Sequence, residues 1–244
     1  MQPQAWNTNA PFIAPNPVTP LNPVPVYPDI HPTAYISPLT SVIGDVTVGP
    51  NVFVAPLVSL RADEGTPFYI GENTNVQDGV IMHGLEHGRV DVDGRRYSIY
   101  IGRRVSCAHG CIIHGPCGLG DDVFVGFNAI VFNAIVDGGS YISMGALVTG
   151  GIRVPPGRFV PPYAIIDTQQ KADALLPVPQ SQAEFAREVI HVNTEFPGAY
   201  SMMLGSGAAA AASPAAPAVC TSCAGYGVQP ARVLRSIPSV APAR

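Results

Sequence analysis

The clearest pattern in the chain is an apolar residue at every sixth position. The period runs from about Asp29 to Ile166 in four phases, which are Ile36, Val42, Val48, Val54 and Leu60; Ile70, Val76 and Met82; Ile101, Cys107, Ile113, Leu119, Val125 and Val131; and Val136, Ile142, Val148, Val154, Val160 and Ile166. A period of six fits neither a helix nor a plain two-residue strand alternation. Hexapeptide periods are typical of β-helices, in which three short strands make one triangular coil.

A second set of mostly apolar or small residues lies two places before these positions. It comprises Ala34, Val46, Val52, Val58, Ile99, Val105, Cys111, Cys117, Val123 and Ala129. Turn-forming glycines recur between the repeats, as in Ile43-Gly44-Asp45 and Leu119-Gly120-Asp121. Stacked coils bury the faces of their neighbours at the spacing of a β-sheet. We therefore predict an all-β fold, a parallel β-helix over residues 29–167.

Two insertions interrupt the period. The first, Arg61 to Pro67, separates the inward positions Leu60 and Ile70; the second begins with the segment from His83 to His87 and includes a turn near Asp93-Gly94. Insertions in solenoids form loops on one face, which is often the functional face. Each insertion begins at a charged or imidazole residue, so we expect the functional site beside these two loops.

The segments that flank the period differ in composition. Residues 1–28 are rich in Pro and Asn, which predicts an extended arm lying along the domain or a neighbour. Residues 168–204 are predicted to be helical and to pack along the β-helix. Residues 205–244 are dominated by Ala, Ser and Pro, which predicts a mostly disordered tail.

Two helices are expected in the C-terminal helical segment. Ala172, Leu175 and Leu176 indicate a short first helix. Apolar residues at helical spacing indicate a second from Ser181 to about Glu195, with Ser181 as its N-cap and Pro197-Gly198 as its end.

Composition narrows the function classes. Charged residues make up 12% of the chain, about half of typical usage, which indicates that another subunit covers part of the surface. Acidic residues exceed basic ones by four and no basic patch stands out, so nucleic acid and anionic membranes are not expected as partners. No apolar run has the length of a membrane span, and the N-terminus has no signal-peptide pattern. We expect a cytoplasmic protein, with a carboxysome inside the cytoplasm as an alternative.

Three histidines are candidate metal ligands. His83 and His114 directly follow the inward positions Met82 and Ile113, so they occupy the same place in the repeat. His109 lies one step further around a turn. Three neutral imidazoles can hold zinc and leave one coordination position open. The offset of His109 predicts a site between subunits of a trimer, whereas the alternative is that histidines on solvated turns have no function.

Other polar residues lie at or near the same repeat position. They are Arg61, Asp63, Glu64, Asn75, Gln77 and Asp78. Each alone could be a turn residue or a member of a surface ion pair. Together with the histidines they predict a polar pocket between subunits.

Five short segments resemble the γ-class carbonic anhydrases. They are Arg61-Ala62-Asp63-Glu64, Asn75-Val76-Gln77-Asp78, His83-Gly84-Leu85-Glu86, Ala108-His109 and Ile113-His114-Gly115-Pro116. The similarity covers about residues 29 to 200 and is strongest to the N-terminal domain of the cyanobacterial carboxysome assembly proteins. It implies a left-handed β-helix, a homotrimer, and reversible hydration of CO2 to bicarbonate by a zinc-bound hydroxide at the subunit interfaces.

The resemblance also implies roles for individual residues. His83 and His114 of one subunit would bind Zn2+ together with His109 of its neighbour, and Fe2+ or Co2+ could occupy the same ligands. Gln77 and Asn75 would hydrogen-bond around the metal-bound water and CO2, with Asn193 near the CO2 site. Glu64 would lie at the reaction centre, and Glu86 would be the proton-shuttle carboxylate. Arg61 and Asp78 would pair across the interface, with Asp63 supporting them.

This sequence departs from the archaeal type of the family in two places. His191 stands where archaeal-type members carry Tyr, two residues before Asn193. The loop after Glu86 lacks their acidic run. The first departure concerns the substrate side of the site, and the second concerns the assignment of Glu86 as proton shuttle.

The five cysteines fall into two groups. Cys107, Cys111 and Cys117 occupy inward positions and are expected to be core residues. Cys220 and Cys223 form a lone C-x-x-C in the tail, without the second ligand pair that a zinc knuckle needs. Because carboxysomal relatives use a C-terminal disulfide to activate the enzyme, the resemblance makes them a candidate redox pair.

Two alternative functions remain. One is a carboxysome scaffold or assembly protein with weak, redox-gated or lost activity, which would bind shell or Rubisco-associated proteins. All three histidines and both glutamates are present, which favours activity, and the chain lacks the small-subunit-like repeats of such scaffolds, although residues 228–238 could act as a docking peptide. The other is a hexapeptide-repeat acyltransferase, which usually has one catalytic histidine and lacks the Arg-x-Asp-Glu and Gln-Asp pairs.

Overall fold

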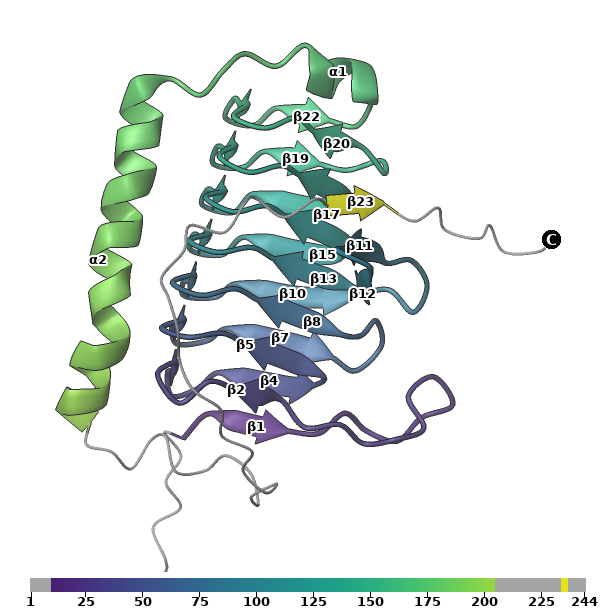
Figure 1. Cartoon of the computed structure of the whole chain (residues 1–244), viewed down its shortest axis with the longest axis vertical. Coiled ribbons are helices and arrows are strands. Elements are labelled where there is room, and N and C mark those ends of the chain that lie inside the picture. Colours follow the sequence, from purple (N-terminus) through teal and green to yellow (C-terminus); the bar gives the residue numbers. More distant parts are fainter. Residues whose placement is uncertain (1–9, 205–233, 237–244) are drawn as a thin grey trace, which may run out of the picture.

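The computed structural model describes residues 10–204 and 234–236 of the 244-residue chain. These residues form the predicted parallel β-helix, with one long helix lying along its side (Figure 1). Each coil contributes one short strand to each of three faces, and equivalent strands of successive coils pair in parallel. The six-residue period therefore predicted the architecture correctly.

The three faces are defined by their strands. The first contains β1(Phe12–Ala14), β4(Ser41–Gly44), β7(Ser59–Ala62), β10(Ile81–Gly84), the starts of β15(Ile112–Leu119) and β17(Ile130–Val136), β19(Leu147–Val148) and β22(Ile165–Ile166). The second contains β2(Asp29–Ile30), β5(Val46–Val48), β8(Phe68–Ile70), β13(Ile99–Ile101), the ends of β15 and β17, and β20(Arg153–Val154). The third contains β3(Tyr35–Ile36), β6(Phe53–Val54), β9(Asn75–Val76), β14(Ser106–Cys107), β16(Phe124–Val125), β18(Tyr141–Ile142) and β21(Phe159–Val160).

The core is one continuous column inside the coils. All the inward positions predicted from the six-residue period belong to it, and the most exposed of them, Ile36, is only 8% exposed. Most of these side chains are aliphatic, which suits a pleated interior that alternates between inward and outward residues. Burial of this column fixes the register of every coil, because a slip of one residue would turn the apolar side chains outward.

Both predicted insertions leave the β-helix at the same corner, between the first and second faces. The first connects β7 to β8, and the second connects β10 to β13 and contains the hairpin β11(Val90–Val92) and β12(Arg95–Tyr97). Asp93 and Gly94 form its turn with φ values of 52° and 80°, as a tight hairpin requires. The backbone of β23(Leu234–Ser236) pairs antiparallel with the other edge of β11.

The long helix, α2(Gln180–Leu204), packs against the third face. It begins one residue before the predicted N-cap Ser181, and the predicted end at Pro197-Gly198 is wrong, because the helix continues through Pro197 to Leu204. Proline in a helix interior removes a hydrogen bond. Here Phe196 and Tyr200, on either side of it, pack against Tyr35 and Phe53, so tertiary packing overrides the local preference.

Two smaller differences concern the flanking segments. The short helix α1(Gln169–Asp173) ends before Leu175 and Leu176, which the prediction had included. Within the predicted N-terminal arm, β1 pairs in parallel with β4 and extends the first face by one strand. In the described part of the chain, no helix is both long and apolar enough to cross a membrane.

The three core cysteines are expected to resist thiol reagents while the protein is folded. Cys107, Cys111 and Cys117 are each 0% exposed. Burial raises the pKa of the Cys111 and Cys117 thiols well above its ordinary value, so the reactive thiolate is not formed near neutral pH. Mass spectrometry after iodoacetamide treatment should find these three unmodified in the native protein and modified after unfolding in guanidinium. Rapid native modification of any of them would contradict this packing.

Candidate metal centre

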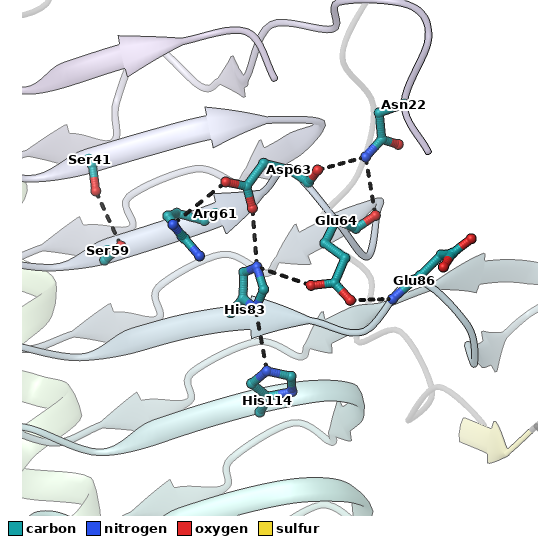
Figure 2. Close-up of polar contacts among 9 residues, drawn as sticks. All are labelled: Asn22, Ser41, Ser59, Arg61, Asp63, Glu64, His83, Glu86 and His114. Atoms are coloured by element: carbon teal, nitrogen blue, oxygen red, sulfur yellow. Dashed lines mark hydrogen bonds and ion pairs between the residues drawn. The ribbon is translucent and has the colours of Figure 1, made fainter. Parts of the chain in front are cut away.

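Neighbouring strands of the first face place three functional candidates in one column. His83 of β10 lies directly opposite His114 of β15 on one side and Arg61 of β7 on the other. Figure 2 shows the side chains projecting from this face beside the two inserted loops. The equivalence of His83 and His114 in the repeat, predicted from the sequence, is therefore seen directly in the strand register.

The two histidines of this column are spaced as metal ligands. His83 Nδ1 lies 3.3 Å from His114 Nε2. Two nitrogens bound to one tetrahedral zinc, each at 2.0–2.1 Å, are separated by about 3.3–3.4 Å. The nitrogen pair therefore has the separation that a shared zinc ion requires.

The second nitrogen of each histidine faces an oxygen that only accepts hydrogen bonds. His83 Nε2 lies 3.1 Å from Asp63 Oδ1, and His114 Nδ1 lies 3.1 Å from the carbonyl oxygen of Gly115. With the ring protons on these nitrogens, the lone pairs of His83 Nδ1 and His114 Nε2 are free to bind one cation between them. Such outer partners are typical of histidines that bind metals.

A row of carboxylates leads away from His83. Glu64 Oε2 lies 3.8 Å from His83 Nε2, and Glu64 Oε1 accepts a hydrogen bond from the Glu86 backbone N–H at 3.1 Å. Beyond it, Glu86 Oε2 lies 3.7 Å from His87 Nε2. Side-chain exposure rises along this row from 18% at His83 through 37% and 45% to 77% at His87. Exposure to solvent therefore increases from His83 toward His87, although Glu64 contacts the backbone N–H of Glu86 and not its carboxylate.

The N-terminal arm holds the first loop in place. The side-chain amide of Asn22 donates hydrogen bonds to the carbonyl oxygens of Asp63 and Glu64, at 2.8 and 3.2 Å (Figure 2). Arg61 lies 3.8 Å from Asp63. Within one chain Arg61 is therefore placed beside Asp63, whereas the pairing of Arg61 with Asp78 predicted across an interface stays a prediction.

The remaining candidates lie around the third face. Asp78 Oδ2 is 3.0 Å from His109 Nδ1, so the third histidine also has a carboxylate on one ring nitrogen. Gln77 Nε2 donates to Asn75 Oδ1, and Asn75 Nδ2 donates to Ser106 Oγ, each at 2.9 Å. Asn75 and Gln77 are buried, which makes this amide chain well defined.

A cavity of about 490 Å³ opens between α2 and the third face. It is lined by Gln77, Asp78, His109 and Asn193 among mostly apolar side chains such as Phe124. The structure thus brings together four predicted residues from two coils and α2. Asn193 itself donates a hydrogen bond from its side chain to the Val189 carbonyl at 2.9 Å.

The candidate residues therefore form two groups in a single chain. One group, on the first face and its loops, contains Arg61, Asp63, Glu64, His83, Glu86 and His114. The other, around the third face, contains Asn75, Gln77, Asp78, His109 and Asn193. Among the described residues of one chain, no group of three or more His, Cys, Asp or Glu side chains could hold a metal ion. Cys220 and Cys223, the candidate redox pair, lie outside the described residues.

Two functional neighbours were missed from the sequence. Ser106 holds Asn75, and His87 ends the carboxylate row. Ser106 could have been found from an offset of 31 residues, which relates it to Asn75 and also relates His109 to Asp78 and His114 to His83. The offset is one coil including the hairpin insertion, so it marks residues that lie side by side.

Sequence comparison connects this geometry with a known family. The chain is 42% identical over 197 residues to a carbonic anhydrase of Methanosarcina thermophila, covering 76% of this chain and 79% of that protein. The chain belongs to the γ-class carbonic anhydrase family. It is also 48% identical over 172 residues to the carboxysome assembly protein CcmM of Nostoc sp., covering 70% of this chain but 31% of that protein.

This γ-class chain thus spans about a third of the length of the carboxysome protein it resembles. No protein-family profile matches it. Among solved structures, a hexapeptide transferase family protein from Anaplasma phagocytophilum is similar, with a TM-score of 0.58 and 28% identity over 72% of this chain and 93% of that one. The structural likeness agrees with the hexapeptide-repeat fold.

Proposed function

We propose that this protein is an active zinc-dependent carbonic anhydrase that interconverts CO2 and bicarbonate, with its sites at the interfaces of a homotrimer. The observation that carries the proposal is the nitrogen pair of His83 and His114, whose 3.3 Å separation fits one zinc ion. His109, with its own carboxylate partner, supplies the third ligand from the adjacent subunit. A closed ring of three subunits brings the two groups of residues together three times.

His83, His114 and the neighbouring subunit's His109 would hold zinc, which would supply the Lewis acidity that ionises water near neutral pH; carbonic anhydrase is itself the reference case for this property. The residues of this chain orient the reactants and move the proton. We assign the uptake of the proton that water releases to Glu64, whose carboxylate lies 3.8 Å from His83 Nε2. Glu86 and His87 follow it toward solvent, and the rising exposure of this row gives the proton a route to buffer.

The amide chain on the third face orients the substrate side of the site. Because Asn75 accepts a hydrogen bond from the Gln77 amide group and donates one to Ser106, its orientation is fixed. Gln77, held by this bond to Asn75, lines the same cavity as Asn193. The apolar remainder of the cavity suits CO2, which carries no charge, while the amide groups suit bicarbonate.

An association with carboxysomes is the second part of the proposal. It is supported by the 48% identity to a carboxysome assembly protein. We propose shell or Rubisco-associated proteins as partners, and a redox influence of Cys220 and Cys223 on activity. The alternative is a scaffold protein with weak or lost activity, and the enzyme assay distinguishes it from an active carbonic anhydrase.

The deciding experiment measures metal content, subunit number and CO2 hydration on the same purified full-length protein. We expect a trimer by sedimentation, about one zinc per chain, and hydration activity that is lost on chelation and returns with zinc or cobalt. Active metal-free protein, or a fully active monomer, would overturn the mechanism. A zinc-bound trimer without activity, both oxidised and reduced, would favour the scaffold.

A further inference from the structure

A buried serine lies behind the metal-binding face. Ser98, directly before β13, is 0% exposed, and its Oγ has no hydrogen-bond partner among the described residues. Its backbone is held on both sides: its N–H donates to the Pro67 carbonyl, and its carbonyl accepts from the Cys117 N–H, each at 2.9 Å. The hydroxyl oxygen therefore has a fixed position without a hydrogen bond of its own.

Three glycines converge on this oxygen, and each directly follows a residue of the candidate site. They are the second members of Glu64-Gly65, His83-Gly84 and His114-Gly115. A β-carbon on Gly84 would meet Ser98 Oγ before any other atom. A β-carbon on Gly65 would lie 2.5 Å from Ser98 Oγ and closer to the Leu85 carbonyl oxygen, and one on Gly115 would lie 2.8 Å from Ser98 Oγ and 2.5 Å from the Ser98 carbonyl oxygen. None of these glycines has a positive φ. Close approach, not backbone conformation, is therefore what requires glycine here.

We propose that Ser98 is a positioning residue for the metal centre. Its hydroxyl oxygen sets the spacing between the backbone segments that carry Glu64, His83 and His114. The inference rests on the proposed function, since it assigns Ser98 a role in that same site. Metal ligands must be placed accurately, and the residues that orient them from behind determine metal affinity. Here the Ser98 side chain lies against the backbone that directly follows each of Glu64, His83 and His114.

The chemistry of the position supports a spacer role. A buried hydroxyl without a partner is unfavourable, and alanine would avoid that cost. What serine supplies beyond alanine is the volume of one oxygen atom between the glycines. Valine would add two methyl groups to a β-carbon that already has no free space, which forces the turns apart.

The first test compares Ser98→Ala and Ser98→Val with Ser140→Ala as a matched control. Ser140 is also buried, but its Oγ donates to the Pro155 carbonyl away from the site. We expect Ser98→Val to weaken zinc binding by about 10- to 100-fold and to shift the visible spectrum of the cobalt-substituted protein. Ser98→Ala should shift the same bands less, and it keeps the test informative if Ser98→Val does not fold. Ser140→Ala should leave both readouts unchanged.

A second test asks whether the contact with Gly84 is direct. Gly84→Ala alone should lose zinc, because its β-carbon meets Ser98 Oγ. Its other contacts are milder, at 3.2 Å from the Gly65 carbonyl oxygen and from Ser98 Cβ. Adding Ser98→Gly to Gly84→Ala removes the obstructing atoms, so zinc binding should recover. Unchanged cobalt spectra and zinc affinity in both Ser98 single variants, or a double variant no better than Gly84→Ala, would overturn the inference.

A crystal structure of Ser98→Ala separates this inference from the proposed function. It should show a changed distance between His83 Nδ1 and His114 Nε2, which is 3.3 Å here. If wild type neither binds zinc nor hydrates CO2, the proposed function fails, while this distance still tests the positioning role. An unchanged distance overturns the positioning role even if the enzyme is active.

Discussion

Replacing His109 by alanine should abolish zinc binding and CO2 hydration while leaving the β-helix folded. The side chain of His109 is 57% exposed in one chain, and its contacts are with Asp78 at 3.0 Å and the ring of Phe127. Its loss therefore costs little folding energy. Two imidazoles hold zinc far more weakly than three. Zinc analysis, thermal melting and stopped-flow hydration on the same preparation check this outcome.

Subunit mixing turns the same variant into a test of the interface. His83→Ala and His109→Ala should each be inactive alone. The two variants are unfolded together and reassembled. A site at an interface is then complete if one subunit is the His109→Ala variant, which keeps His83 and His114, and its neighbour is the His83→Ala variant, which keeps His109. Random assembly should then restore about one quarter of wild-type activity. A mixture of His83→Ala with His114→Ala is the matched control and should stay inactive, because both ligands come from one subunit. Recovery in the control, or none in the mixture, contradicts the shared site.

The β-helix could be predicted from the sequence because every coil needs apolar side chains at the same positions of its repeat. Each side chain that points into the β-helix, such as Leu60 or Met82, must be apolar. The six-residue period therefore resumes after each insertion. The same rule predicted that His83 and His114 would lie side by side, which the strand register confirms. The family was predicted from five short segments, and the comparison with known proteins confirms it.

Other features could not be read from the sequence because they depend on contacts between distant segments. The helix continues through Pro197 because Tyr200 stacks on Tyr35 and Phe196 packs edge-on against Phe53, both more than 130 positions earlier in the chain. Ser98 follows the hairpin of the second insertion and carries no sequence motif. Its contact with three glycines appears only when three coils are stacked. The sequence therefore predicts candidate ligands and proton carriers from motifs, whereas a residue such as Ser98, proposed here to position them, belongs to no motif.

Replacing Glu64 by glutamine should leave zinc bound and reduce kcat by about 10²- to 10⁴-fold, the usual contribution of a general acid or base. Glutamine keeps an oxygen that can accept the hydrogen bond from the Glu86 N–H, so the loop should stay in place. It cannot take up a proton at neutral pH. Because Glu64 lies on the Nε2 side of His83, away from the nitrogen that faces His114, zinc content should not change.

The matched control for this variant is Glu184→Gln, which alters an exposed carboxylate on α2 that accepts a hydrogen bond from the Gln180 side chain. Its kcat should equal that of wild type. Glu86→Gln should have a smaller effect than Glu64→Gln and should recover in concentrated imidazole buffer, since Glu86 lies further along the route to solvent, with 45% of its side chain exposed. Wild-type kcat in a fully zinc-loaded Glu64→Gln protein would remove Glu64 from the proton route. Loss of zinc from that variant would instead show that Glu64 supports the ligands, because proton transfer alone does not hold the metal.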